Sequence, residues 1–205
     1  MTSCYRICLA LTVFLAAGAA LADSTFTYGG HSYTIVTTPA TWTVARAAAA
    51  ARGEHLAFID SAAENTAIFN ALVAAGITTT ANDGGGAKYA WIGGTDDPTA
   101  VAAASEGNFY WSDGTQFWSG GLTGSASGGK YANFGTVNSR EPDNWTTQNC
   151  VGLGVTNWPN GAAGQWNDIK GTNSLVYVTE AVPEPATFVL LGAGVLVLVL
   201  MRVRR

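Results

Sequence analysis

The amino-acid sequence predicts a single α+β domain, and three observations support this fold class. Two helical patterns lie in the first half of the chain, whereas the second half holds short strand-like segments separated by long loops. About 160 residues lie between two apolar ends, which is enough for one sizeable hydrophobic core. The seven tryptophans are spread through the strand-like segments and can supply much of that core.

The first elements are a hairpin and a helix. Residues 25–36 alternate apolar and polar side chains around Gly29-Gly30, a pattern that predicts two antiparallel strands. Thr41 can then cap an alanine-rich helix over residues 42–51, which Gly53 terminates.

A second helix begins at a Ser-x-x-Glu capping box. Ser61 and Glu64 are three residues apart, so each side chain can accept a hydrogen bond from a free main-chain N–H group of the first turn. The apolar pattern continues to Gly76, where the helix is predicted to end.

The remaining segments are short and strand-like, and no internal repeat, phosphate-binding loop or zinc-ligand spacing is present. Two polar, glycine-rich stretches, residues 78–88 and 119–130, are interpreted as solvated loops. The predicted strands are residues 55–59, 89–93, 108–111, 150–154, 164–169 and 175–179.

The N-terminal end has the pattern of a secretory signal peptide, predicted to comprise residues 1–22. Arg6 precedes an apolar run over residues 7–20, and the small-residue sequence Ala20-Leu21-Ala22 follows as a cleavage site. The sequence therefore predicts export across the inner membrane.

The C-terminal end, residues 182–205, combines Pro183-Glu184-Pro185, an uncharged run over residues 186–201 and a terminal arginine cluster. The run is a marginal membrane-spanning helix, with its basic end in the cytoplasm. This tail resembles the PEP-CTERM sorting signal of Gram-negative, biofilm-forming bacteria. The resemblance implies a transient anchor in the inner membrane, removal by an exosortase, and release to the cell surface or extracellular matrix; a permanent single-pass anchor is the alternative.

Charge and cysteine content limit the partners that the domain can bind and the way in which it can be stabilised. Without Arg6 and the three terminal arginines, six of the ten basic residues remain against fourteen acidic ones, a net charge of −8. Such a surface repels nucleic acid and suits cations. Cys4 and Cys8 would leave with the signal peptide, so Cys150 has no partner for an intrachain disulfide.

Residues 141–168 hold the richest chemistry of the chain. Glu141-Pro142-Asp143-Asn144-Trp145 opens this stretch and Trp166-Asn167-Asp168 closes it. Carboxylates and carboxamides are oxygen ligands for a hard cation such as calcium, and an adjacent tryptophan offers an apolar face of the size of a sugar ring.

Together these motifs resemble a C-type lectin domain, predicted over residues 23–181. The fold implied by this resemblance has paired terminal strands, two flanking helices and a long ligand-binding loop, here without the usual disulfides, because Ala49, Gly171 and Thr179 occupy cysteine positions of the family. The landmarks, in order, are Trp42, Gly53-Glu54-His55-Leu56-Ala57-Phe58-Ile59, Ser61, Glu64-Asn65, Trp91-Ile92-Gly93-Gly94, Trp111-Ser112-Asp113-Gly114, Glu141-Pro142-Asp143-Asn144-Trp145, Cys150 and Trp166-Asn167-Asp168.

The resemblance also implies a set of calcium ligands. In the family Pro142 would follow a cis peptide bond that turns its neighbours toward one ion. Gln148 replaces a family acid, but Asp143 adds a carboxylate within the same shell, so three carboxylates remain. The implied ligands are Glu141, Asp143, Gln148, Asn167 and Asp168.

A bound sugar would contact part of the same set. A vicinal diol can replace two waters on the ion while it exchanges hydrogen bonds with the ligands, so Glu141, Asp143 and Asn167 are predicted to bind sugar, with Trp145 stacking on its apolar face. Glu141 matches the mannose-binding type of site in the family, whereas Asp143 followed by Trp145 matches the galactose-binding type. The sequence therefore does not decide between these two sugars. Trp145 is otherwise a core residue, the role that we favour for Trp166.

An auxiliary calcium site of the family is echoed in part by Asp96, Glu106 and Asn144. Gln148 and Asn149 stand where that site has acids, so we do not expect it to be occupied.

Three functions are compatible with these residues. The favoured prediction is an exported, calcium-dependent module that binds a polysaccharide or glycan at the cell surface or in the matrix. The alternative is a metal-independent adhesion or matrix protein with the same fold. A glycosidase using two of Glu141, Asp143 and Asp168 is not favoured, because these acids alternate with Asn, Gln and Pro as metal ligands do.

Overall fold

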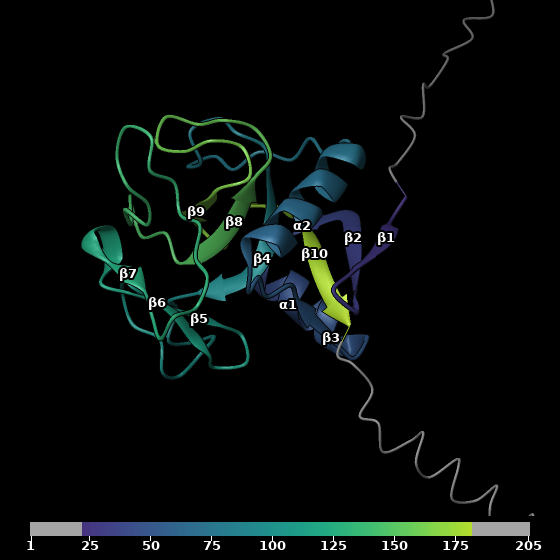
Figure 1. Cartoon of the computed structure of the whole chain (residues 1–205), viewed down its shortest axis with the longest axis horizontal. Coiled ribbons are helices and arrows are strands. Elements are labelled where there is room, and N and C mark those ends of the chain that lie inside the picture. The colour runs from purple at the N-terminus through teal and green to yellow at the C-terminus, as the bar shows by residue number, and fades with distance from the viewer. Residues whose placement is uncertain (1–21, 182–205) are drawn as a thin grey trace, which may run out of the picture.

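The computed structural model describes residues 22–181, so the sorting tail and all but the last residue of the predicted signal peptide lie outside this part of the chain (Figure 1). It contains two α-helices and short strands that join into one sheet, which confirms the α+β prediction. The elements are β1 Ser24–Tyr28, β2 His31–Ala40, α1 Trp42–Ala51, β3 Glu54–Leu56, α2 Ala62–Ala74, β4 Tyr89–Thr95, β5 Asn108–Trp111, β6 Gln116–Ser119, β7 Ser125–Ala126, β8 Cys150–Gly154, β9 Trp166–Ile169 and β10 Leu175–Ala181.

Strand β10 is the centre of the sheet. It pairs antiparallel with β2 and β3 and parallel with β4, so the first and last parts of the domain lie side by side. Strand β4 also pairs with β5 and β8, and β8 pairs with β9. The expected pairing of N- and C-terminal strands is confirmed, and α1, α2 and β10 gather on one side of the domain while β5–β9 and the long loops occupy the other (Figure 1).

Both helices begin where the sequence predicts. The Thr41 hydroxyl accepts a hydrogen bond from the main-chain N–H of Val44, and the Ser61 hydroxyl accepts one from Glu64. The capping box differs from its usual form in the hydrogen bond that the Glu64 side chain accepts. The Glu64 carboxylate accepts from the N–H of Asp60, one residue before the cap, and from the Tyr33 hydroxyl, which ties the start of α2 to β2.

Two predicted strands, 55–59 and 164–169, extend beyond the observed β3 and β9, and two observed strands were missed. Residues 57–59 lie outside β3, because the N–H of Ala57 bonds to Val178 while its carbonyl accepts from Gly93, so this segment crosses between β10 and β4. Strands β6 and β7 were not predicted; β7 lies within the stretch 119–130 that was interpreted as a loop.

Tryptophans fill the interior as expected. Six of the seven are buried, namely Trp42, Trp91, Trp111, Trp118, Trp158 and Trp166. Trp111 stacks on Phe117 at a centroid separation of 4.1 Å, and Trp166 packs edge-on against both rings. Dense aromatic packing, and not a disulfide, stabilises this core, because Cys150 is a free thiol.

No helix within residues 22–181 is long and apolar enough to cross a membrane. The apolar run 186–201, which carries the predicted membrane helix, lies outside the described residues.

Candidate metal and ligand site

The predicted ligand residues converge on one face of the domain. Strand β9 carries Asn167 and Asp168, while Glu141 and Asp143 lie in the long loop before β8. One oxygen from each of Glu141, Asp143 and Asp168 lies within 4.8 Å of the others. Among residues 22–181 this is the one group of three or more His, Cys, Asp or Glu side chains that is close enough to share a metal ion.

Asp168 holds the long loop against the sheet. It is fully buried on β9, and its two carboxylate oxygens accept hydrogen bonds from the main-chain N–H groups of Asp143, at 3.1 Å, and Asn144, at 2.8 Å. These two bonds bring Glu141 and Asp143 to the same side as Asp168. The peptide bond between Glu141 and Pro142 is cis, as the resemblance implied.

The following segment has an unusual backbone. Asn144, Thr146 and Thr147 all have positive φ, at 49°, 60° and 66°. Non-glycine residues rarely occupy this left-handed region, and such strained positions tend to gather at functional sites. Trp145 stands between them with 60% of its surface exposed, so it is not a core residue, whereas Trp166 is fully buried as favoured.

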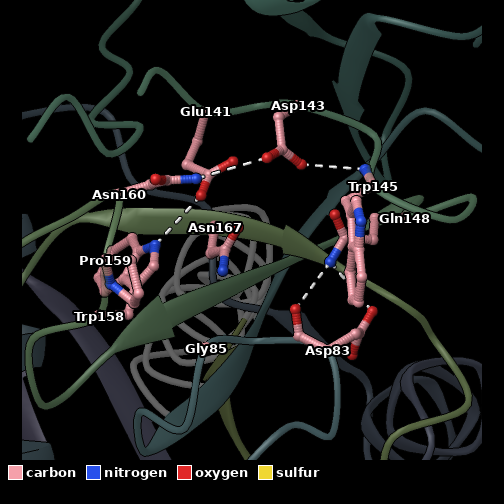
Figure 2. Close-up of a pocket in the computed structure, with 10 residues that line it drawn as sticks. All are labelled: Asp83, Gly85, Glu141, Asp143, Trp145, Gln148, Trp158, Pro159, Asn160 and Asn167. Carbon is pink, nitrogen blue, oxygen red and sulfur yellow. Dashed lines mark hydrogen bonds between the residues drawn. The ribbon is translucent and has the colours of Figure 1, made fainter. Parts of the chain in front are cut away.

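The cavity at this site has a volume of about 270 Å³ (Figure 2). Five predicted site residues line it, namely Glu141, Asp143, Trp145, Gln148 and Asn167. Asp168 is fully buried and is not one of the lining residues; its carboxylate holds the loop that carries Glu141 and Asp143. The remaining wall consists of Asp83, Gly85, Trp158, Pro159 and Asn160.

Two buried oxygens at the site receive no hydrogen bond from residues 22–181: Glu141 Oε2 and Gln148 Oε1. The other oxygen of Glu141 accepts from the indole N–H of Trp158 at 3.1 Å. The amide nitrogen of Asn167 donates a hydrogen bond to the Tyr89 hydroxyl, so the side-chain carbonyl oxygen of Asn167 does not take part in that bond. Buried polar atoms are rarely without a partner, so two in one site indicate space for a ligand.

The electrostatics also favour a cation. Burial, followed by the proximity of Asp143, raises the pKa of Glu141. Burial and the charges of Glu141 and Asp143 raise the pKa of Asp168 well above its usual range. None of the ion pairs within residues 22–181 involves these carboxylates. A divalent cation would offset this repulsion, and the oxygen-only donor set fits calcium.

The sequence-based interpretation missed three contributors to the site. Trp158 and Asn160 hydrogen-bond to Glu141 and Asp143, respectively, from the loop before β9. Asp83 reaches the site from the segment 78–88, which was interpreted as a solvated loop; its carboxylate accepts from Gln148. Its only signal in the sequence is an acid next to three glycines, a pattern typical of many turns.

The residues of the auxiliary pattern lie apart from this cavity. Asp96 is fully buried; one carboxylate oxygen accepts from the N–H of Gly107, and the other receives no hydrogen bond within the described chain. Burial raises the pKa of Asp96 to about 7. Glu106 and Asn144 line a neighbouring hollow beside Pro142.

Comparison with known proteins agrees with this architecture. The mouse scavenger receptor C-type lectin carbohydrate-recognition domain is similar at 22% identity, over 78% of this chain and 95% of that domain, with a TM-score of 0.53. The C-type lectin CEL-I from Cucumaria echinata matches at 22% identity over 83% of this chain and all of its own length, with a TM-score of 0.56. A calcium-independent type II antifreeze protein matches at 20% identity, covering 82% and 96% of the two chains, with a TM-score of 0.50.

Sequence comparisons add the tail. The family described as the PEP-CTERM protein-sorting motif matches residues 181–205. No curated protein matches the chain significantly in sequence. The chain thus combines a domain of the C-type lectin-like fold with a C-terminal PEP-CTERM protein-sorting motif.

Proposed function

We propose that this protein is an exported, calcium-dependent carbohydrate-binding module. The observation that carries the proposal is the pair of buried, unpartnered oxygens of Glu141 and Gln148, which border one cavity beside the carboxylates of Asp143 and Asp168. A hard cation accepts six to eight such oxygens and tolerates irregular geometry.

Each residue has a distinct role in the proposed site. Glu141, Asp143 and Asp168 supply three carboxylates, and Gln148 and Asn167 supply carbonyl oxygens. When bound, calcium would offer positions at which sugar hydroxyls can replace water. Glu141, Asp143 and Asn167 would then hydrogen-bond to the sugar, and the exposed face of Trp145 would pack on its apolar side.

The ends of the chain direct the module to its place of action. The sorting motif at residues 181–205, together with the predicted signal peptide at residues 1–22, supports export, a transient stay in the inner membrane and recognition by an exosortase. The proposed destination is the cell surface or extracellular matrix of a Gram-negative bacterium, where the domain at residues 23–181 would meet exopolysaccharide or surface glycans.

A metal-independent adhesion or matrix role is the second candidate. Gln148 replaces a charged ligand, and one protein of similar fold is described as calcium-independent. A catalytic role has less support. Along the chain these acids alternate with Asn, Gln and Pro as metal ligands do, and no histidine lines the cavity beside them.

Calcium titration of the purified protein tests the proposal. Extracellular calcium modules bind in the range of about 0.1–1 mM, so calcium up to about 10 mM should raise the melting temperature and change tryptophan fluorescence. Glu141→Gln keeps the size of the side chain and its contact with Trp158 but removes one charge, and we expect it to weaken calcium binding at least tenfold.

A glycan array with calcium or with a chelator separates the two candidates. Binding that requires calcium and disappears in Glu141→Gln supports the lectin function. Glycan binding that is equal in chelator, or a wild-type protein that shows no response to calcium, would favour the metal-independent role.

A further inference from the structure

Asp83 is held firmly beside the site by three partners. Its Oδ2 accepts hydrogen bonds from the main-chain N–H of Lys170 at 2.9 Å and from Gln148 Nε2 at 3.0 Å. Its Oδ1 accepts from Asn173 Nδ2 at 2.6 Å. The main-chain carbonyl of Asp83 also accepts from Gln148 Nε2, at 3.1 Å.

These contacts decide which way the Gln148 amide faces. Ionised carboxylate oxygens and carbonyl oxygens only accept hydrogen bonds, so the amide nitrogen must lie toward Asp83. Oε1 is therefore turned away from Asp83, and Figure 2 shows it on the side of Asp143 and Asn167. Gln148 is 2% exposed, and no donor within residues 22–181 reaches this oxygen.

We propose that Asp83 is a positioning residue of the cation site, which orients the Gln148 amide so that Oε1 is offered to the ion. The inference rests on the calcium site proposed above. It explains how a neutral carboxamide can serve at a position where an acid would be the stronger ligand. The Asp83 carboxylate accepts a hydrogen bond from the amide nitrogen, which fixes the amide and makes Oε1 a better acceptor for a cation.

The arrangement also explains why position 148 is not an acid in this chain. A carboxylate there would place one of its oxygens, in the position of Nε2, about 3 Å from two acceptor oxygens of Asp83, with no proton between them. Asp83 and Gln148 thus form a matched unit. Residues that orient a metal ligand commonly change metal affinity by about 10–100-fold when they are removed.

A double-mutant cycle tests whether Asp83 acts through Gln148. Calcium dissociation constants are measured by calorimetry on the purified full chain for the wild type, Asp83→Ala, Gln148→Ala and the double variant. We expect Asp83→Ala to weaken calcium binding about tenfold when Gln148 is present, and by less than twofold in the Gln148→Ala background. Equal losses in both backgrounds would show a charge effect alone and overturn the positioning role.

Two further variants distinguish a loss of calcium affinity from a loss of protein stability. Asn173→Ala removes a hydrogen bond from the same carboxylate without touching Gln148, and we expect a lower melting temperature in chelator with a calcium affinity within twofold of wild type. A tenfold loss in this control would overturn the assignment to the Gln148 contact. If Asp83→Ala does not fold, Asp83→Asn takes its place in the cycle, with an expected threefold loss that vanishes when it is combined with Gln148→Ala.

The outcomes for the proposed function and for this inference differ. A wild-type chain that binds no calcium overturns both. Calcium binding that is normal in the wild type and unchanged in Asp83→Ala overturns only the positioning role, and leaves the calcium site standing.

Discussion

Gly171 lies where a side chain would meet Cys150: a Cβ built at Gly171 is 2.8 Å from the Cys150 sulfur and 3.8 Å from its Cβ. A Cβ–Cβ separation of about 3.8 Å is the average for disulfides. A cysteine at position 171 would therefore lie at the right distance from Cys150 for a disulfide, in agreement with the expectation that Gly171 occupies a cysteine position of the family.

The first prediction is that Gly171→Cys forms a disulfide with Cys150 under oxidising conditions. It would close a loop of about 20 residues, for which chain entropy gives a stabilisation of about 3 kcal/mol. Free-thiol titration and the melting temperature with and without reductant check this. Gly171→Ala is the control: it adds the Cβ but no bond, so it should destabilise the protein. In the chain that lacks residues 1–22, and with them Cys4 and Cys8, two free thiols after oxidation would contradict the prediction.

A second prediction concerns calcium and pH. The pKa values of Glu141 and Asp168 are raised, so protons compete with calcium as the pH falls toward those values. The calcium-dependent rise in melting temperature should therefore be full at pH 8 and shrink steadily on acidification. Without calcium, the effect of these two carboxyls on stability has the opposite sign. A carboxyl whose pKa is raised by folding binds its proton more tightly in the folded state, so it increases the free energy of unfolding as the pH falls.

Melting temperatures from pH 8 to pH 5, with calcium and with chelator, test this prediction. A calcium increment that is constant across the range would show that these carboxylates do not bind the ion.

A third prediction isolates Asp96. Its folded pKa of about 7 exceeds the ordinary value of 3.8, so this group lowers the free energy of unfolding as the pH rises from about 4 through 7. Asp96→Asn keeps an oxygen for the N–H of Gly107 and removes the buried charge. In chelator, the variant should be more stable than wild type at pH 8 by roughly 1–3 kcal/mol, and this difference should diminish at pH 5. Denaturant unfolding at the two pH values measures it; a difference that does not depend on pH would refute the assignment.

The fourth prediction is that Trp145 contributes to glycan binding and not to the stability of the fold. Because its side chain is exposed, Trp145→Ala should change the free energy of unfolding by less than about 0.5 kcal/mol. If the ring packs on a sugar, the same change should weaken glycan binding about tenfold while calcium affinity stays within twofold. Val137→Ala is a matched control, since Val137 is equally exposed, at 57%, but does not line the cavity. Similar glycan affinities for the two variants would exclude stacking by Trp145.

Local patterns predicted the fold class and many of the elements. The cap at Thr41 and the capping box at Ser61 mark the helix starts, because capping depends on residues only three apart. Strands such as Cys150–Gly154 were predicted within their observed bounds, since both faces are buried and the apolar run is continuous. Strand β7 was missed because two residues carry too little pattern to separate a strand from a loop. Strand β6 is as long as the predicted β5, but it runs into the polar, glycine-rich stretch 119–130 that was interpreted as a loop.

The sequence by itself determined where the candidate ligands lie, because Glu141 to Trp145 and Trp166 to Asp168 are contiguous motifs rich in carboxylates and carboxamides, and the resemblance to the C-type lectin family added Gln148 to them. Tertiary structure decided how they meet: Asp168 accepts two N–H groups from a loop 24 and 25 residues away along the chain. It also decided that Asp83, 65 residues before Gln148, orients the amide of that side chain. The physical reason is that a hydrogen bond depends on distance in space, and between segments so far apart that distance is fixed only by the packing of the strands and loops that carry them.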